Sequence, residues 1–193
     1  GASSTVAWHE GLNFAAVQRC PLILMVEANQ FAFSSPTSTN TRVESFVEKA
    51  PGYGIGAESV DGTDVIAVYE AVSRSAERAR AGEGTQMVEL RYFRRLGHAQ
   101  HDSQEYVDPA LISEWAKKDP IDCFQARILE NGWAAADELD AIRVEVEAAC
   151  QAAAEQAIGE PLPKGPDAVD DVYTDVVTPH PWTRSASSDS RLA

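Results

Sequence analysis

The sequence has few cysteines, and their spacing excludes two common site types. Its 193 residues contain only three, Cys20, Cys123 and Cys150. An odd number of widely separated cysteines fits neither a disulfide framework nor the ligand spacing of a zinc site. We therefore expect reduced thiols in a cytosol-like compartment. The expected location is the cytoplasm, or the mitochondrial matrix if the source is eukaryotic.

Basic residues and long apolar runs are also scarce. Sixteen Lys and Arg stand against thirty Asp and Glu, so the formal net charge is -14. Nucleic-acid binding needs clustered cations to contact phosphates, and we expect no nucleic-acid partner. No apolar run approaches the length that spans a bilayer, and we expect no membrane partner either. The hydrophobic content of 44% is ordinary for a globular protein.

The chain lacks an initiating methionine and begins Gly1-Ala2-Ser3-Ser4-Thr5. Ser3, Ser4 or Thr5 suits the N-cap of a helix that starts at the first residues. Exposed amides at such a start attract anions, phosphate above all, although a plain capped helix is an alternative. Because no strand precedes this helix, we expect the sequence to be the carboxyl-terminal part of a longer protein.

Residues 21–31 form the most apolar stretch, PLILMVEANQF. The pattern predicts a central strand buried on both faces. It ends at Glu27, where polar residues begin, and ligands in open α/β sheets lie beyond the carboxyl ends of strands. Asn29 is therefore a candidate binding residue. The alternative is that it only caps a turn.

Strands and helices alternate after this stretch. Residues 55–60 and 86–93 are predicted strands, and residues 42–49 and 65–81 are predicted helices, with Thr63 as the expected cap of the second. Alternation of this kind predicts parallel βαβ units and an α/β fold.

The last predicted strand runs into a loop rich in ionisable groups, residues 94–102. His98 and His101 could be surface histidines or metal ligands, and their spacing does not decide. Arg94 and Arg95 precede them, which favours phosphate over a metal as the ligand.

The remainder of the chain is predicted to be helical and then extended. Helices are expected at residues 109–118, 120–129 and 135–157, the last with an apolar stripe from Leu139 to Ala149 that should pack on a neighbour. Residues 159–193 are rich in Pro and Ser, which indicates an extended, partly disordered tail. The expected regions are an α/β domain over residues 1–107, a helical region over 108–158, and the tail over 159–193.

Five segments together carry a family resemblance. They are GASS (residues 1–4), EGLNFAA (10–16), EANQF (27–31), VDGTDV (60–65) and RRLGHAQHD (94–102). In this order and spacing the chain resembles the alpha subunit of the thiamine diphosphate-dependent first component of 2-oxo acid dehydrogenases, of pyruvate or branched-chain type. The likeness covers only the carboxyl-terminal part of that subunit, from Gly1 to about residue 177.

The resemblance implies a fold and a metal site. The fold would be part of the doubly wound, mainly parallel sheet of the thiamine diphosphate-binding proteins, followed by C-terminal helices and the tail. Gly1 matches the second glycine of the cofactor motif, and the acidic Mg²⁺ ligand that precedes it in the family is absent from this chain. The side chain of Asn29 and the carbonyl of Phe31 match the other Mg²⁺ ligands, while Ala28 replaces the motif's first Asn.

The resemblance also implies the residues that contact the cofactor and the reaction. His98 is the expected catalytic residue. The expected cofactor-binding residues are Gly1, Ala2, Ser3, Glu27, Asn29, Phe31, Arg94 and His98.

The implied activity is oxidative decarboxylation of a small 2-oxo acid, with acyl transfer to a lipoyl group. The implied partners are a beta subunit, in an α2β2 heterotetramer, and the lipoyl-bearing acyltransferase. Residues 35–38 and 51–55 look closest to the branched-chain type. Two alternatives stay open, an acetoin-cleaving alpha subunit and a non-catalytic remnant that binds a partner. We expect the isolated 193-residue chain to be inactive.

Overall fold

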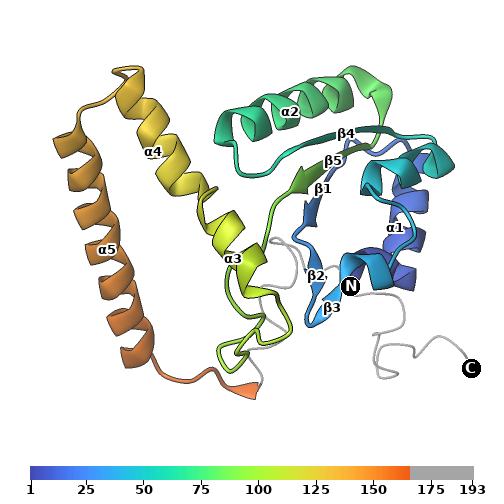
Figure 1. Ribbon diagram of the computed structural model, residues 1–193. Helices are drawn as coiled ribbons and strands as arrows, with labels where there is room; N and C mark the ends of the chain where they lie inside the picture. The colour runs from blue at the N-terminus through green and yellow to red at the C-terminus, as the bar shows by residue number, and fades with distance from the viewer. Residues whose placement is uncertain (166–193) are drawn as a thin grey trace, which may run out of the picture. The chain divides into compact units, whose positions relative to one another are not determined.

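The computed structural model describes residues 1–165 (Figure 1). The chain divides into two compact units, residues 1–139 and 140–193. The first contains every strand of the described residues, and the second begins inside the long helix α5. The region boundaries expected from the sequence, at residues 107 and 158, stay predictions.

The first unit is built on a three-stranded parallel sheet. Its strands are β1 (Ile23–Ala28), β4 (Gly56–Asp61) and β5 (Gln86–Arg91), in the order β1-β5-β4. A separate antiparallel pair joins β2 (Phe31–Ala32) to β3 (Ser35–Pro36). The parallel sheet with its intervening helices confirms the predicted α/β class. The three carboxyl ends lie at one edge because all three strands run the same way.

Helices flank the sheet and follow it. The described helical segments are the 3₁₀ helices η1 (Ala2–Ser4), η2 (Thr37–Thr39) and η3 (Phe46–Tyr53), the α-helices α1 (Val6–Val17), α2 (Val65–Arg78), α3 (Pro109–Ala116), α4 (Pro120–Glu130) and α5 (Ala136–Gly159), and the π-helix η4 (Ala79–Glu83). The chain passes from β1 over β5 to β4, then returns through α2 to β5. Right-handed crossovers in opposite directions place their connections on opposite faces of the sheet.

Two apolar clusters confirm that both faces are covered. On one face α1 and η3 contribute Leu12, Phe46 and Ala50 to a cluster with Val26 and Met87. On the other face, where Figure 1 shows α2, Ala71 of this helix belongs to a cluster with Val88 and Leu90. Consecutive residues of β5 thus point to opposite faces, and Gln86 to Leu90 are all buried.

The central strand is β5, so the prediction that residues 21–31 form a strand buried on both faces is wrong. Val26 and Ala28 are buried, but Met25 is 45% exposed and Glu27 is exposed too. Within the described residues β1 pairs only with β5, and α2 lies mainly over β5 and β4. A run of apolar residues in the sequence does not distinguish a central strand, paired on both sides, from a strand paired on one side.

The helix predicted at residues 42–49 begins later, as η3 at Phe46. Its start is determined by a buried carboxylate: Glu89, in β5, accepts hydrogen bonds from the Phe46 N–H at 2.8 Å and from the Ser45 hydroxyl. Glu48 closes a capping box by accepting from the Ser45 N–H at 2.8 Å. The prediction failed because the decisive acceptor lies on a strand more than forty residues away.

Helix caps were predicted more accurately elsewhere. Thr5 caps α1 by accepting from the Trp8 N–H at 3.3 Å. Asp108 and Asp119 cap α3 and α4, which begin at Pro109 and Pro120, the residues where the sequence predicts these two helices to start. The predicted cap of α2 was wrong by one residue: Asp64 accepts from the first turn, while Thr63 donates to Asp61.

Helix α5 has no buried residue. In its predicted packing stripe, Ile142 is 57% exposed and Val146 is 54% exposed, so these two side chains are not buried within the described residues. Residues 161–164 have no regular structure, and the predicted tail beyond residue 165 lies outside the described residues. No helix in the described part of the chain is both long and apolar enough to cross a membrane.

We predict that Glu89→Leu lowers the free energy of unfolding by about 2 kcal/mol, because the buried Phe46 N–H loses its acceptor. Denaturant unfolding of the protein measures this. Glu89→Gln keeps an acceptor oxygen and serves as the control, with a smaller expected loss. Equal stability of the Leu variant and the parent would contradict the role given to Glu89.

Candidate active site

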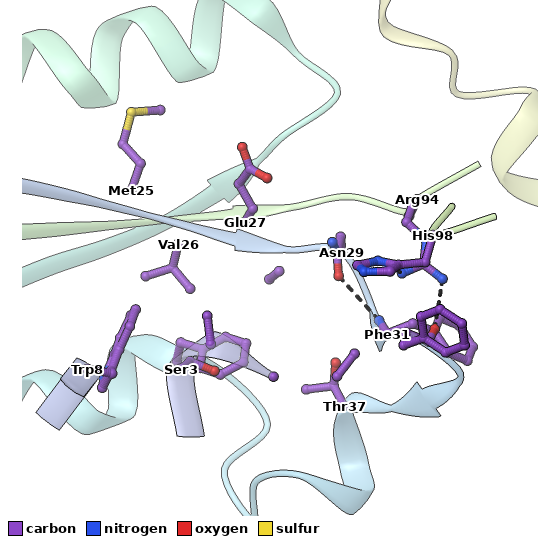
Figure 2. A pocket seen from close by; sticks show the side chains of 16 residues that line it. Ser3, Trp8, Met25, Val26, Glu27, Asn29, Phe31, Thr37, Arg94 and His98 are labelled. Atoms are coloured by element: carbon purple, nitrogen blue, oxygen red, sulfur yellow. Dashed lines mark hydrogen bonds between the residues drawn. The ribbon is translucent and has the colours of Figure 1, made fainter. Parts of the chain in front are cut away.

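A cavity of about 670 Å³ lies at the carboxyl end of β1 (Figure 2). It is lined by all eight residues that the sequence predicts to bind a cofactor: Gly1, Ala2, Ser3, Glu27, Asn29, Phe31, Arg94 and His98. They come from three separate segments of the chain. The structure therefore brings these residues together, while the role of each stays a prediction.

Asn29 follows directly after β1. Its backbone carbonyl accepts from the Arg94 N–H at 3.4 Å, which ties it to the segment after β5. Its side-chain oxygen Oδ1 accepts from the Phe31 N–H, also at 3.4 Å (Figure 2). That is a turn-capping contact, as the alternative reading of Asn29 expects, but it exceeds the usual length of such bonds. The oxygen is therefore only weakly engaged.

The backbone between Asn29 and Phe31 is sharply turned. Gln30 has a φ of 73°, in the left-handed region that is uncommon for residues other than glycine. Its side-chain Nε2 donates to the carbonyls of Ala28 at 3.1 Å and Tyr92 at 3.3 Å. These bonds bridge β1 and β5 and hold the turn that presents Asn29 and Phe31.

Phe31 is held by aromatic packing. Its ring lies edge-on to Phe93 at 6.2 Å and tilted against Tyr106 at 5.8 Å between ring centroids. In the β2–β3 pair it stands opposite Pro36. The neighbouring opposite residues are hydrogen-bonded, since the Gln30 carbonyl accepts from the Thr37 N–H at 2.9 Å, so Phe31 and Pro36 form a non-hydrogen-bonded pair and the Phe31 carbonyl oxygen takes no ladder hydrogen bond from Pro36.

Most of the Arg94 guanidinium is already engaged. Its Nη2 donates to the Phe33 carbonyl at 2.8 Å and to the Tyr106 hydroxyl at 2.6 Å, and its Nε donates to the Leu96 carbonyl at 3.2 Å. Its Nη1 lies 3.4 Å from Nδ1 of His98. A guanidinium has five N–H groups, so one on Nη1 remains for a ligand. Arg94 thus shapes the loop as well as supplying positive charge.

His98 lies at the cavity beside Arg94 (Figure 2). An arginine N–H can only donate, so Nδ1 of a neutral His98 must accept, and the ring proton then resides on Nε2. The ring also packs edge-on against Phe33, with 5.1 Å between centroids. His98 therefore presents an N–H donor that suits an anionic oxygen. His101 does not line this cavity.

Asp102 and Tyr106 hold the loop that carries His98. The Asp102 carboxylate accepts from the His98 backbone N–H at 2.7 Å, from the Tyr106 hydroxyl at 2.7 Å and from the Gln104 N–H at 3.0 Å. These bonds, led by the one from His98, hold the pKa of the Asp102 carboxyl below its ordinary value. The turn is tight: a Cβ on Gly97 would lie 2.2 Å from the Asp102 carbonyl oxygen.

Glu27 lines the cavity, but its carboxylate is bound elsewhere. Its Oε2 accepts from the Tyr92 hydroxyl at 3.0 Å. Figure 2 shows its side chain on the same side of β1 as Met25, opposite Val26 and Trp8. Burial first, and then the bond to Glu27, raise the pKa of Tyr92 to about 12, so this hydroxyl keeps its proton at neutral pH.

The donor set suits a hard cation beside an anion. In the described part of the chain no three His, Cys, Asp or Glu side chains lie close enough together to hold a metal ion. The Asn29 amide oxygen and the Phe31 carbonyl are neutral oxygen donors of the kind that Mg²⁺ accepts when phosphate oxygens and water complete its shell. Arg94 and His98 provide donors for those phosphates on the same cavity.

Three residues of this site were missed in the sequence. Tyr92, Asp102 and Tyr106 each make a polar contact with a predicted site residue. Only the four-residue spacing of Asp102 and Tyr106 is visible in the sequence, and in a loop that spacing has no fixed geometry.

We predict that Asp102→Asn loosens the loop that carries His98. The Asp102 carboxylate should stabilise the folded loop at pH values above the ordinary pKa of its carboxyl. This stabilisation should be lost as the pH falls through the lowered pKa of the folded state. Hydrogen exchange of the His98 amide should be several-fold faster in the variant at neutral pH. Asp140→Asn, on an exposed part of α5, is the control. Unchanged exchange at His98 would refute this account of the loop.

The chain is also similar in sequence to known proteins. The alpha subunit of acetoin:2,6-dichlorophenolindophenol oxidoreductase from Cupriavidus necator is 37% identical over 90% of this chain and 52% of its own length. The alpha subunit of 2-oxoisovalerate dehydrogenase from Bacillus subtilis is 35% identical over 90% of this chain and 53% of its own length. The alpha subunit of the pyruvate dehydrogenase E1 component from Staphylococcus aureus is 39% identical over 68% of this chain and 36% of its own length.

The chain thus spans about half the length of the first two relatives. The family described as "Dehydrogenase E1 component" matches residues 1–165, which include every residue of the cavity. The chain belongs to the dehydrogenase E1 component family.

Proposed function

We propose that this chain belongs to the alpha subunit of a thiamine diphosphate-dependent 2-oxo acid dehydrogenase first component, and that the cavity binds the diphosphate end of the cofactor with Mg²⁺. The observation that carries the proposal is the meeting of residues 1–3, 27–31 and 94–98 at one cavity. Neutral oxygen donors and cationic donors face it together. Family membership and the similarity to three alpha subunits support the same function.

Asn29 and Phe31 would hold the Mg²⁺. Amide and carbonyl oxygens suit this hard cation, and the weakly engaged Oδ1 of Asn29 can exchange its long contact for a metal bond. The aromatic contacts of Phe31 keep its carbonyl in place. Any further protein ligand of the Mg²⁺ would come from a residue other than Asn29 and Phe31.

His98 and Arg94 would bind the diphosphate. The Nε2–H of His98 and the remaining N–H of Arg94 are donors, and a charged donor strengthens such bonds. Because an imidazole nitrogen can donate or accept a proton, we assign His98 the proton transfers at the mouth of the site. When bound, thiamine diphosphate supplies the electron sink for decarboxylation.

The partners we propose follow from this assignment. The alpha subunit would pair with a beta subunit in an α2β2 heterotetramer. The acyl product would pass to a lipoyl group on the acyltransferase. The disulfide of the lipoyl group would be reduced as the acyl thioester forms. The substrate would be a small 2-oxo acid, since two of the relatives are named for 2-oxoisovalerate and pyruvate.

A second candidate substrate is acetoin, favoured by the 37% identity to the acetoin oxidoreductase subunit. Turnover of 2-oxoisovalerate, pyruvate and acetoin by the complete alpha subunit with its beta subunit would decide between them. We expect turnover of a 2-oxo acid with CO₂ release and little reaction with acetoin. Failure to bind thiamine diphosphate at all would instead favour a non-catalytic, partner-binding protein.

We predict that Asn29→Ala abolishes Mg²⁺-dependent binding of thiamine diphosphate while thermal unfolding of the cofactor-free protein is unchanged. The reason is the loss of one oxygen ligand from an octahedral shell. Calorimetric titration of the complete alpha–beta assembly measures the affinity, with exposed Asn13→Ala as the control. Unchanged cofactor affinity in Asn29→Ala would defeat the metal assignment.

We predict unequal effects for the two loop histidines. His98→Ala removes a donor at the cavity and should cost about 1.5–3 kcal/mol, or roughly ten- to a hundred-fold in rate or cofactor affinity. His101→Ala is the matched control and should cost much less, since His101 does not line the cavity. Acyl transfer to a lipoyl domain is the assay. Equal losses in the two variants would show that His98 has no special part.

A further inference from the structure

Phe33 has an unusual backbone conformation for an aromatic residue. With Ser34 it forms the two-residue loop that joins β2 to β3, and its φ is 53°, in the left-handed region. Gly, Asn and Asp favour this conformation, and a bulky side chain seldom adopts it. The side chain is also 46% exposed, so burial in a core does not account for it. Phe33 lines the cavity, and strained residues of this kind are concentrated at functional sites.

In this conformation Phe33 contacts two predicted site residues that lie more than sixty residues further along the chain. Its carbonyl accepts from Nη2 of Arg94 at 2.8 Å. Its ring meets the imidazole of His98 with 5.1 Å between ring centroids and 72° between ring planes. Both values lie in the range of the edge-to-face arrangement that aromatic pairs prefer. Phe33 therefore joins the loop between β2 and β3 to the loop that carries His98.

Two contacts hold the His98 ring, and they differ in what they determine. Nη1 of Arg94 lies 3.4 Å from Nδ1, which is long for a hydrogen bond and leaves the ring plane free to turn about this contact. The Phe33 ring packs against the imidazole and limits that rotation. The orientation of the imidazole plane decides where the other nitrogen, Nε2, directs its N–H. Phe33 thus sets the direction of the donor that the proposed diphosphate contact needs.

We propose that Phe33 is a positioning residue, which holds the His98 imidazole in the orientation that directs Nε2–H to the diphosphate site. The inference rests on the proposed function, because it takes His98 as a ligand of the diphosphate. Phe33 acts through His98 and needs no contact of its own with the cofactor. The left-handed backbone is part of the arrangement, since it allows the carbonyl to meet Arg94 while the ring meets His98.

Phe33→Leu isolates the contribution of the ring. Leucine, like phenylalanine, has a Cβ that disfavours the left-handed region, so the substitution leaves the backbone strain much the same. The hydrogen bond from Arg94 goes to the main-chain carbonyl and does not depend on the side chain. Phe33→Tyr keeps the ring and should behave as the parent protein does. Phe14→Leu, at an exposed position of α1 outside the cavity, is the matched control.

The first measurement is a double-mutant cycle on the complete alpha subunit with its beta subunit. Thiamine diphosphate is titrated calorimetrically at saturating Mg²⁺. Phe33→Leu should weaken cofactor binding roughly three- to tenfold, the range that corresponds to one edge-to-face pair. In the His98→Ala background the same substitution should change the affinity by less than about twofold, because no imidazole remains to be positioned. Equal losses in the two backgrounds, or no loss in either, would overturn the proposal.

The second measurement needs no cofactor. Diethyl pyrocarbonate modifies the unprotonated nitrogen of an accessible imidazole, and tandem mass spectrometry distinguishes His98 from His101 in the same loop. Phe33→Leu should raise the modification rate of His98 several-fold and leave that of His101 unchanged, since only the His98 ring loses its restraint.

A similar rise at both histidines would mean a general loosening of the loop, and no rise at His98 would mean that Phe33 does not hold the ring; each result overturns the proposal. If His98→Ala alone leaves the cofactor affinity unchanged, it is the proposed function of His98 that fails, while the modification rates still show whether Phe33 holds its ring.

Discussion

The pairing of β5 with a parallel neighbour on each side is the constraint on which the rest of this structure depends. It aligns the carboxyl ends of β1, β5 and β4, and on the β1 side the pairing continues past the strands through the Tyr92 and Arg94 N–H groups. Asn29 is thereby held beside the segment that leads to His98. The cavity exists because two loops, more than sixty residues apart, leave one edge of one sheet.

Beyond that edge, side chains replace backbone pairing as the source of order. Arg94 uses most of its donors on loop carbonyls and on Tyr106, and Asp102 accepts three hydrogen bonds from the same loop. Arg94, Asp102 and Tyr106 are half-buried, so each bond still competes with water and stabilises the loop only modestly. A site built in this way responds to single substitutions through geometry more than through stability.

Local patterns allowed accurate prediction where neighbouring residues decide the outcome. The N-cap at Thr5 and the starts of α3 and α4 at Pro109 and Pro120 depend on contacts within a few residues. Prediction failed where a distant group decides. The start of η3 depends on Glu89, and the exposure of β1 depends on which strands and helices lie beside it. Periodicity likewise described the stripe of α5 without revealing whether anything covers it.

The sequence by itself determined the α/β class, the family and eight of the residues that line the cavity, because each is written in short motifs and in their order. Only the tertiary structure decided what those residues do to one another. It turned the Glu27 carboxylate to Tyr92, used most of the Arg94 donors within the protein, and separated His98 from His101. Hydrogen-bond direction depends on which partner lies within about 3 Å, and that is set by folding between distant segments.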